Sequence, residues 1–176
     1  IKEAITGLMN GGRSSFSLLD IGAGNGHLLS LLCADGMTPA HYVAFEPDAD
    51  LCFDLKTRVR DLEFTKDQTK IYPSSFMTTT KVSQAGGVAD VVLLSQSLYG
   101  VEDKRAYVAN ALSFVAPGGV LLIFHRWTPS GTIAEISRAL FEDKILHYMH
   151  TYDVALDLSS LTLEEIGRLS TYTKQD

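Results

Sequence analysis

Short continuous runs of hydrophobic residues alternate along the chain with longer segments in which hydrophobic residues recur every three or four positions. The continuous runs have the length of β-strands, and the spaced segments are typical of helices with one buried face. Strands are predicted at residues 17–21, 41–45, near 70–72, 89–94 and 120–124, with a further strand over 148–158. Helices are predicted at 28–33, after the capping residue Asp48, over 102–115, from about Thr132, and over 161–169.

The predicted strands are hydrophobic throughout rather than at alternate positions. Strands of that kind are buried on both faces, as in a parallel sheet that helices cover on each side. The sequence therefore predicts an α/β fold, a three-layer sandwich around a mainly parallel sheet. The helix over 102–115 is expected to end in a turn at Pro117, Gly118 and Gly119.

Composition narrows the range of partners and locations. Lys and Arg number 15 against 21 Asp and Glu, which gives a net charge of −6, and we find no basic patch that would hold a nucleic acid. No hydrophobic run approaches the length of a membrane span, and we find no signal peptide. We therefore expect a cytoplasmic protein with neither nucleic acid nor membrane as partner. The sequence favours no particular oligomeric state.

The chain is expected to form one domain over residues 1–176, clipped at both ends. It begins at Ile1 without a methionine, and an edge strand after Asp176 is expected to be missing. Cys33 and Cys52 lie among hydrophobic residues of predicted helices, so both are interpreted as reduced core residues. No metal site is expected, because no set of three ligands can be identified.

A glycine-rich loop follows the first predicted strand: Asp20, Ile21, Gly22, Ala23, Gly24, Asn25 and Gly26. Glycines allow the backbone to turn tightly and to approach a ligand, and the next helix adds its amino-terminal N–H groups. The G-x-G-x-G spacing departs from the G-x-G-x-x-G fingerprint of dinucleotide-binding proteins. A plain turn and a nicotinamide-dependent oxidoreductase remain as alternatives.

An acidic residue ends the second predicted strand. Glu46, followed by Pro47, lies 20 residues after Gly26. A carboxylate in this place can accept hydrogen bonds from both hydroxyls of a ribose. Alone, Glu46 could be a surface residue, but together with the glycine loop it indicates a nucleoside cofactor.

The Asp-x-Gly-x-Gly-x-Gly pattern of residues 20–26 resembles motif I of the class I S-adenosylmethionine-dependent methyltransferases. Residues 87–99 resemble that family's fourth strand and following loop, and residues 111–121 resemble its helix, Pro-Gly-Gly turn and fifth strand. The resemblance implies a Rossmann-like sheet with the strand order 3-2-1-4-5 and strand 6 beyond strand 5. It also implies S-adenosylmethionine as cofactor and S-adenosylhomocysteine as product. The implied cofactor-binding residues are Asp20, Gly22, Ala23, Gly24, Gly26, Glu46, Pro47, Ser74, Ser75 and Ser95.

Within this family, residues 43–47, 95–103 and 152–159 resemble the histamine N-methyltransferase group. The resemblance implies a small-molecule substrate with an amine or imidazole nitrogen, which Gln96 contacts in a pocket that Tyr99 helps to form. His125, at the end of the fifth predicted strand, is a candidate base, with a polar rim residue as the alternative. For Gln96 and Tyr99 the alternative is that one caps the next helix and the other packs on it.

The absence of a Ser/His/Asp or Cys/His set does not argue against an enzyme. A sulfonium methyl group is already activated, so the protein has to align the acceptor and exclude water rather than supply a nucleophile. A non-catalytic S-adenosylmethionine-binding module of a methyltransferase complex remains as a second alternative.

Overall fold

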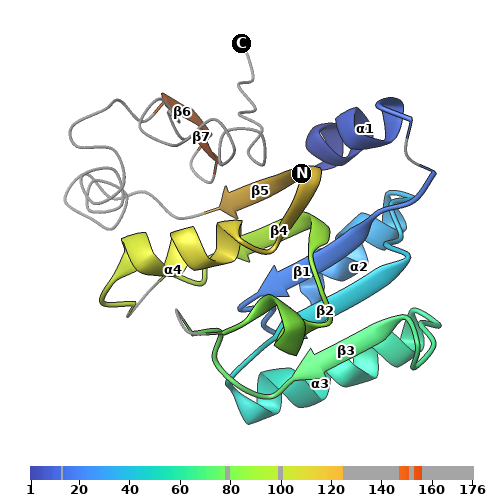
Figure 1. Ribbon diagram of the computed structural model, residues 1–176. Coiled ribbons are helices and arrows are strands. Elements are labelled where there is room, and N and C mark those ends of the chain that lie inside the picture. Colours follow the sequence, from blue (N-terminus) through green and yellow to red (C-terminus); the bar gives the residue numbers. More distant parts are fainter. Residues whose placement is uncertain (13, 78–79, 99–100, 125–146, 151–152, 156–176) are drawn as a thin grey trace.

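The computed structural model describes residues 1–12, 14–77, 80–98, 101–124, 147–150 and 153–155. A central sheet has helices on both of its faces, with α4 on one face and α2 and α3 on the other (Figure 1). The strands are β1 (Ser17–Ile21), β2 (His41–Phe45), β3 (Thr69–Tyr72), β4 (Ala89–Ser95), β5 (Val115–Phe124), β6 (His147–His150) and β7 (Asp153–Ala155). The helices are α1 (Lys2–Asn10), α2 (His27–Ala34), α3 (Ala49–Asp61), the 3-10 helix η1 (Val82–Ala85) and α4 (Lys104–Leu112).

The strands lie in the order β3-β2-β1-β4-β5-β7-β6. The first five are parallel, which confirms the predicted order 3-2-1-4-5. The single strand predicted over 148–158 is wrong, because β6 and β7 pair antiparallel with each other and β7 lies between β5 and β6. A run of strand-forming residues does not reveal that the chain reverses within it.

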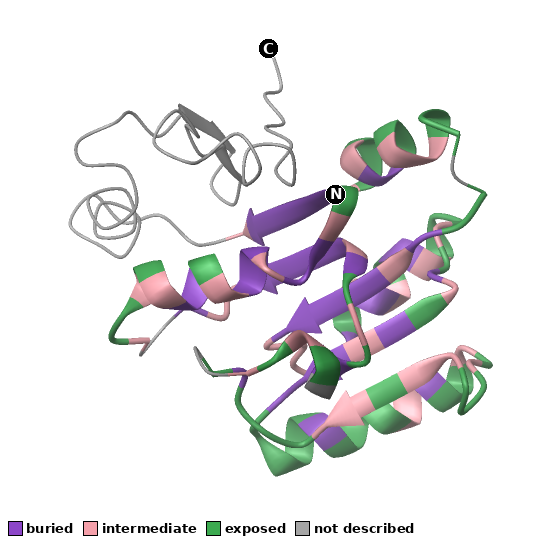
Figure 2. Ribbon diagram, in the orientation of Figure 1, coloured by how far each residue is buried: buried purple, intermediate pink, exposed green. Residues whose placement is uncertain are grey.

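Hydrophobic side chains fill both sides of the sheet, as the continuous apolar runs predict. Leu19 and Val92 belong to the core beneath α4, whereas Leu18 and Val91 belong to the core shared with α1, α2 and α3. Figure 2 shows the resulting band of buried residues along β1, β4 and β5. α1 and η1 were not predicted; Ile5 of α1 is fully buried in the second core.

Asp48 caps α3 as predicted, because its Oδ1 accepts from the N–H groups of Asp50 and Leu51, each over 3.0 Å. The helix predicted over 102–115 is shorter at both ends. It begins after Asp103, whose Oδ1 accepts from the N–H of Ala106 over 2.8 Å, and it ends at Leu112. The chain enters β5 at Val115, so the helical spacing of hydrophobic residues continues beyond the end of the helix.

The Pro-Gly-Gly segment does not end α4 but lies within β5, where it interrupts the regular pairing with β4. The register passes from Ala89 opposite Val115 directly to Val91 opposite Val120. A Cβ on Gly119 would lie 2.6 Å from the carbonyl oxygen of Asp90, so only glycine fits this close approach.

Both cysteines are free. Cys52 is buried in the core as predicted, whereas Cys33 is only partly buried and packs against the core. None of the described helices is long and hydrophobic enough to cross a membrane. The helices predicted from Thr132 and over 161–169 lie outside the described residues.

Candidate functional site

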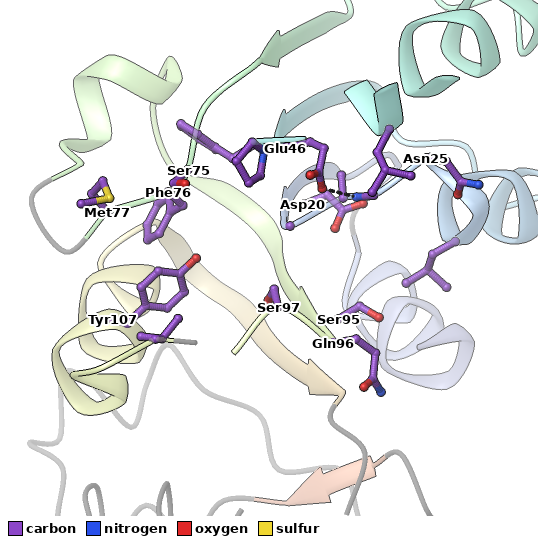
Figure 3. A pocket seen from close by; sticks show the side chains of 18 of the residues that line it. Asp20, Asn25, Glu46, Ser75, Phe76, Met77, Ser95, Gln96, Ser97 and Tyr107 are labelled. Atoms are coloured by element: carbon purple, nitrogen blue, oxygen red, sulfur yellow. Dashed lines mark hydrogen bonds between the residues drawn. The ribbon is translucent and has the colours of Figure 1, made fainter. Parts of the chain in front are cut away.

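A cavity of about 960 Å³ lies at the carboxyl ends of β1, β2, β3 and β4 (Figure 3). Between β1 and β4 the strand order reverses, which is where open α/β sheets bind ligands. The predicted site residues that line the cavity are Asp20, Gly22, Ala23, Gly24, Glu46, Pro47, Ser75, Ser95 and Gln96. Two predicted residues do not line the cavity: Gly26 is the N-cap of α2, and Ser74 is exposed to solvent. Tyr99 and His125 lie outside the described residues.

The glycine loop has a conformation that requires glycine. Gly22, Gly24 and Gly26 have φ angles of +75°, +58° and +75°, in the left-handed region that side chains disfavour. A Cβ on Gly22 would overlap the Cβ of Ser97 on the β4 loop. The N–H groups of Gly22 and Ala23 donate to the carbonyl of Phe45 over 2.9 and 3.1 Å, which ties the loop to the end of β2.

Arg58 of α3 holds this loop from outside. Its Nε donates to the carbonyl of Asn25 over 2.8 Å, and its Nη1 donates to the hydroxyl of Ser30 over 3.1 Å. The sequence analysis did not single out Arg58. The available signal is spacing, because Arg58 lies three residues after the buried Leu55 and so faces the same way.

Glu46 is buried at the edge of the cavity, with 5% of its surface exposed, so it is not a surface residue. One carboxylate oxygen accepts from the N–H of Gly24 over 2.7 Å and the other accepts from the N–H of Asp48 over 2.9 Å. A carboxylate can accept about four hydrogen bonds, so Glu46 can accept more from a ligand in the cavity.

Asp20 is more deeply buried, with 2% of its surface exposed. Its Oδ2 accepts from the hydroxyl of Tyr42 over 3.1 Å, whereas its Oδ1 has no hydrogen-bond partner among the described residues. Burial raises the pKa of Asp20 to about 7; the Tyr42 hydrogen bond lowers this pKa, and the negative charge of Glu46 raises it. An unpaired buried carboxylate oxygen is costly, so this arrangement favours a ligand with a cationic donor.

The loop after β4 places Ser95, Gln96 and Ser97 in the cavity wall. Gln96 has a φ of +56°, and its N–H donates to the carbonyl of Phe124 at the end of β5 over 2.7 Å. A left-handed non-glycine residue costs about 1–3 kcal/mol and is typical of ligand-binding positions. Gln96 does not cap the next helix, since Asp103 does. The hydroxyl of Ser97, which the sequence did not single out, is buried and has no hydrogen-bond partner among the described residues.

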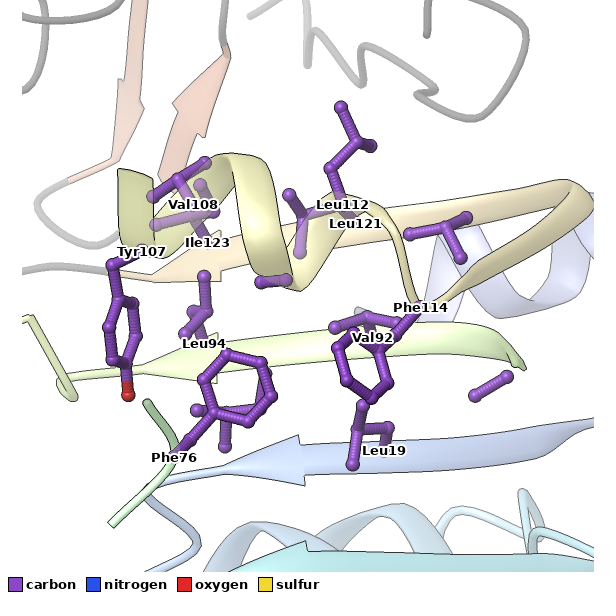
Figure 4. Packing of buried hydrophobic residues seen from close by; sticks show 14 of the residues in the cluster. Leu19, Phe76, Val92, Leu94, Tyr107, Val108, Leu112, Phe114, Leu121 and Ile123 are labelled. Atoms are coloured by element: carbon purple, nitrogen blue, oxygen red, sulfur yellow. The ribbon is translucent and has the colours of Figure 1, made fainter. Parts of the chain in front are cut away.

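Two aromatic residues and a methionine form the opposite wall of the cavity, where Figure 3 shows Phe76, Met77 and Tyr107 across from Asp20 and Glu46. The Phe76 ring makes edge contacts with Phe45 and Tyr107 at 5.4 and 5.3 Å between centroids. Figure 4 shows this wall merging with the core beneath α4. The described residues contain no cluster of His, Cys, Asp or Glu that could hold a metal ion.

Comparison with known protein families and solved structures points to the same kind of fold. The family model of the methyltransferase domain matches residues 3–155. No curated protein sequence matches. Among solved structures, YhhF of Escherichia coli shares 14% identity at a TM-score of 0.58, with 87% of this chain and 83% of that one covered.

The StiE O-MT segment shares 20% identity at a TM-score of 0.56, with 97% of this chain and 58% of that one covered. The S-adenosylmethionine-dependent methyltransferase of Thiobacillus denitrificans, solved in complex with S-adenosyl-L-homocysteine, shares 15% identity at a TM-score of 0.52, with 78% of this chain and 55% of that one covered. This chain thus spans little more than half of these last two proteins, and at such identities the similarity shows a common fold. With its Rossmann-like sheet and the match of the family model over most of its length, the chain belongs to the methyltransferase domain family.

Proposed function

We propose that this domain binds S-adenosylmethionine and transfers the methyl group to an amine or imidazole nitrogen of a small molecule. The choice of substrate rests on the negative charge of the cavity lining. Its described lining includes four carboxylates, from Asp20, Glu46, Glu102 and Asp103, and no Lys or Arg. Such a site attracts cationic ligands and repels phosphates and other anions.

The residues present fit the cofactor at each of its polar ends. The unpaired Oδ1 of Asp20 would accept from the ammonium group, and Glu46 would accept from the ribose hydroxyls. The backbone of the glycine loop would surround the amino-acid portion, with Pro47 and Ser75 beside the adenine. The cofactor supplies an activated methyl group, so the chain has to bind it, orient the acceptor and exclude water.

Gln96 is the proposed contact to the substrate. Its side-chain amide offers one acceptor and two donors and stays neutral, so it can orient a nitrogen without protonating it. The exposed carboxylates of Glu102 and Asp103 lie along the same cavity and would draw a cationic amine toward it. An amine has to lose its proton before transfer. His125 as base and Tyr99 as pocket residue remain predictions, as do a cytoplasmic location and the absence of nucleic acid and membrane partners.

The test is a screen for release of S-adenosylhomocysteine with small amines and imidazoles, and with matched phenols and thiols. We expect turnover with members of the nitrogen set. The Gln96→Ala variant should lose turnover while its affinity for S-adenosylhomocysteine changes by less than about three-fold. Turnover only with phenols or thiols would contradict the nitrogen acceptor. Tight cofactor binding without turnover in the whole panel would favour the non-catalytic module.

A further inference from the structure

Tyr42 lies directly behind the proposed ammonium site although it does not reach the cavity lining. It is fully buried on β2, and the sheet register places it opposite Leu18, while Asp20 lies opposite Ala44. Tyr42 and Asp20 are therefore diagonal neighbours on one face of the sheet, within reach of a long side chain. The Tyr42 hydroxyl donates to Oδ2 of Asp20 over 3.1 Å, and Oδ1 is the oxygen without a partner.

We propose that Tyr42 is a positioning residue for the cofactor, whose hydroxyl holds Oδ2 of Asp20 and leaves Oδ1 to accept from the ammonium group. This inference rests on the proposed binding of S-adenosylmethionine. In this role, Tyr42 fixes the rotamer of the Asp20 side chain and favours its charged form, so that the carboxylate can bind the ammonium group of the cofactor.

The charge of the Asp20 carboxylate depends on the groups that surround Asp20 and Tyr42. Burial and the nearby carboxylate of Glu46 raise the pKa of Asp20, whereas the Tyr42 hydrogen bond lowers it. The pKa of Tyr42 is raised well above its ordinary value, by burial first and then by Asp20, Cys33 of α2 and Glu46, so Tyr42 remains a donor. A protonated Asp20 would pair poorly with an ammonium group. Cofactor affinity should therefore rise as the pH rises through the titration of Asp20.

Tyr42→Phe keeps the ring in the core and removes only the hydroxyl. Because a hydrogen bond to a charged group is lost, the affinity for S-adenosylhomocysteine at pH 7 should fall about ten-fold. The midpoint of the affinity–pH profile should move to higher pH, and alkaline pH should restore part of the affinity. In an Asp20→Asn background, Tyr42→Phe should have almost no further effect, because the two residues act as one unit.

The experiment is calorimetric titration of S-adenosylhomocysteine between about pH 6 and pH 8. The proteins are the wild type, Tyr42→Phe, Asp20→Asn, the double variant, and Tyr72→Phe as a control that removes a tyrosine hydroxyl on β3, outside the cavity lining. A second probe is 5′-methylthioadenosine, which lacks the amino-acid portion. We expect its affinity to be the same in the wild type and in Tyr42→Phe.

An unshifted pH profile in Tyr42→Phe, or an equal loss of affinity for both probes, would overturn the role of Tyr42. Asp20→Asn provides an independent check that leaves Tyr42 intact, since the pH dependence of affinity should disappear in it. Failure of the wild type to bind either probe would instead overturn the proposed function, and this inference with it.

Discussion

The N–H of Gly24 donates to the carboxylate of Glu46 over 2.7 Å, which joins the glycine loop after β1 to the acid that ends β2. The same carboxylate accepts from the N–H of Asp48 at the start of α3. Two motifs that lie 22 residues apart therefore form one structural unit at the edge of the cavity. A change at Glu46 should affect the shape of the loop as well as a direct contact to a ribose.

Gly22 and Gly24 should respond differently to alanine. Both have a positive φ, but a Cβ on Gly22 would overlap Ser97, whereas a Cβ on Gly24 would have no atom within 4 Å. Gly24→Ala carries only backbone strain, about 1–3 kcal/mol, and Gly22→Ala carries the steric overlap in addition. Urea unfolding should rank the wild type above Gly24→Ala and Gly24→Ala above Gly22→Ala. Equal stability of the two variants would contradict the close packing of Gly22 on the β4 loop.

Arg58 should support ligand binding without touching the ligand. Arg58→Met removes the hydrogen bonds to the Asn25 carbonyl and to Ser30, so the affinity for S-adenosylhomocysteine should fall about ten-fold. Arg58→Lys should recover little, because an ammonium group lacks the fork that reaches both acceptors. The matched control is Arg60→Met, an exposed residue of the same helix. Calorimetry showing equal affinity in the Arg58 and Arg60 variants would rule out this support.

The stability of the ligand-free protein should depend on pH through Asp20. Its pKa is raised from 3.8 to about 7 in the folded state, so the folded protein binds the proton more tightly than the unfolded chain. The stabilisation is complete below about pH 4 and is lost as the pH rises through about 7. The free energy of unfolding of the wild type, relative to Asp20→Asn, should therefore fall as the pH rises from about 4 to about 7. A constant difference between the two proteins over this range would contradict the raised pKa.

Gln96 should lower the stability of the folded protein through its backbone, while its side chain supports turnover. Its left-handed backbone is strained with any side chain, so Gln96→Gly should be more stable than Gln96→Ala by about 1 kcal/mol. Both variants lack the amide and should lose turnover on the substrate. Thermal unfolding and the release assay measure the two effects separately. If Gln96→Gly were the less stable of the pair, the strain at this position would be disproved.

Much of the fold is predictable because local signals agree with tertiary packing. β1 and β2 begin and end where predicted, since their hydrophobic runs are flanked by turn residues. The end of α4 is not predictable in this way, because Val115 continues the helical spacing although it belongs to β5. α1 gives a weak signal, with Ile5 as its buried residue.

The site, like the fold, is predictable from the sequence only in part. The residues at the ends of β1, β2 and β4 are predictable, because each follows a hydrophobic strand and carries a recognisable motif. Tyr42, Arg58 and Ser97 were missed, because each contacts a residue that is distant in sequence: Tyr42 is 22 residues from Asp20, Arg58 is 33 residues from Asn25, and Ser97 packs against Gly22 of the glycine loop. Contacts of that kind arise from strand pairing and helix packing, which the sequence pattern does not display.

The proposed cofactor site is tested most directly by calorimetric titration of S-adenosylhomocysteine into the wild type and Glu46→Ala, with NADH as the competing ligand class. We expect the wild type to bind S-adenosylhomocysteine and not NADH. Glu46→Ala, which removes the proposed ribose acceptor and the anchor of Gly24, should lose about 1.5–3 kcal/mol, roughly a 10- to 150-fold weaker affinity. Unchanged affinity in Glu46→Ala would contradict the proposed cofactor site, and tight binding of NADH without S-adenosylhomocysteine would contradict the proposed function.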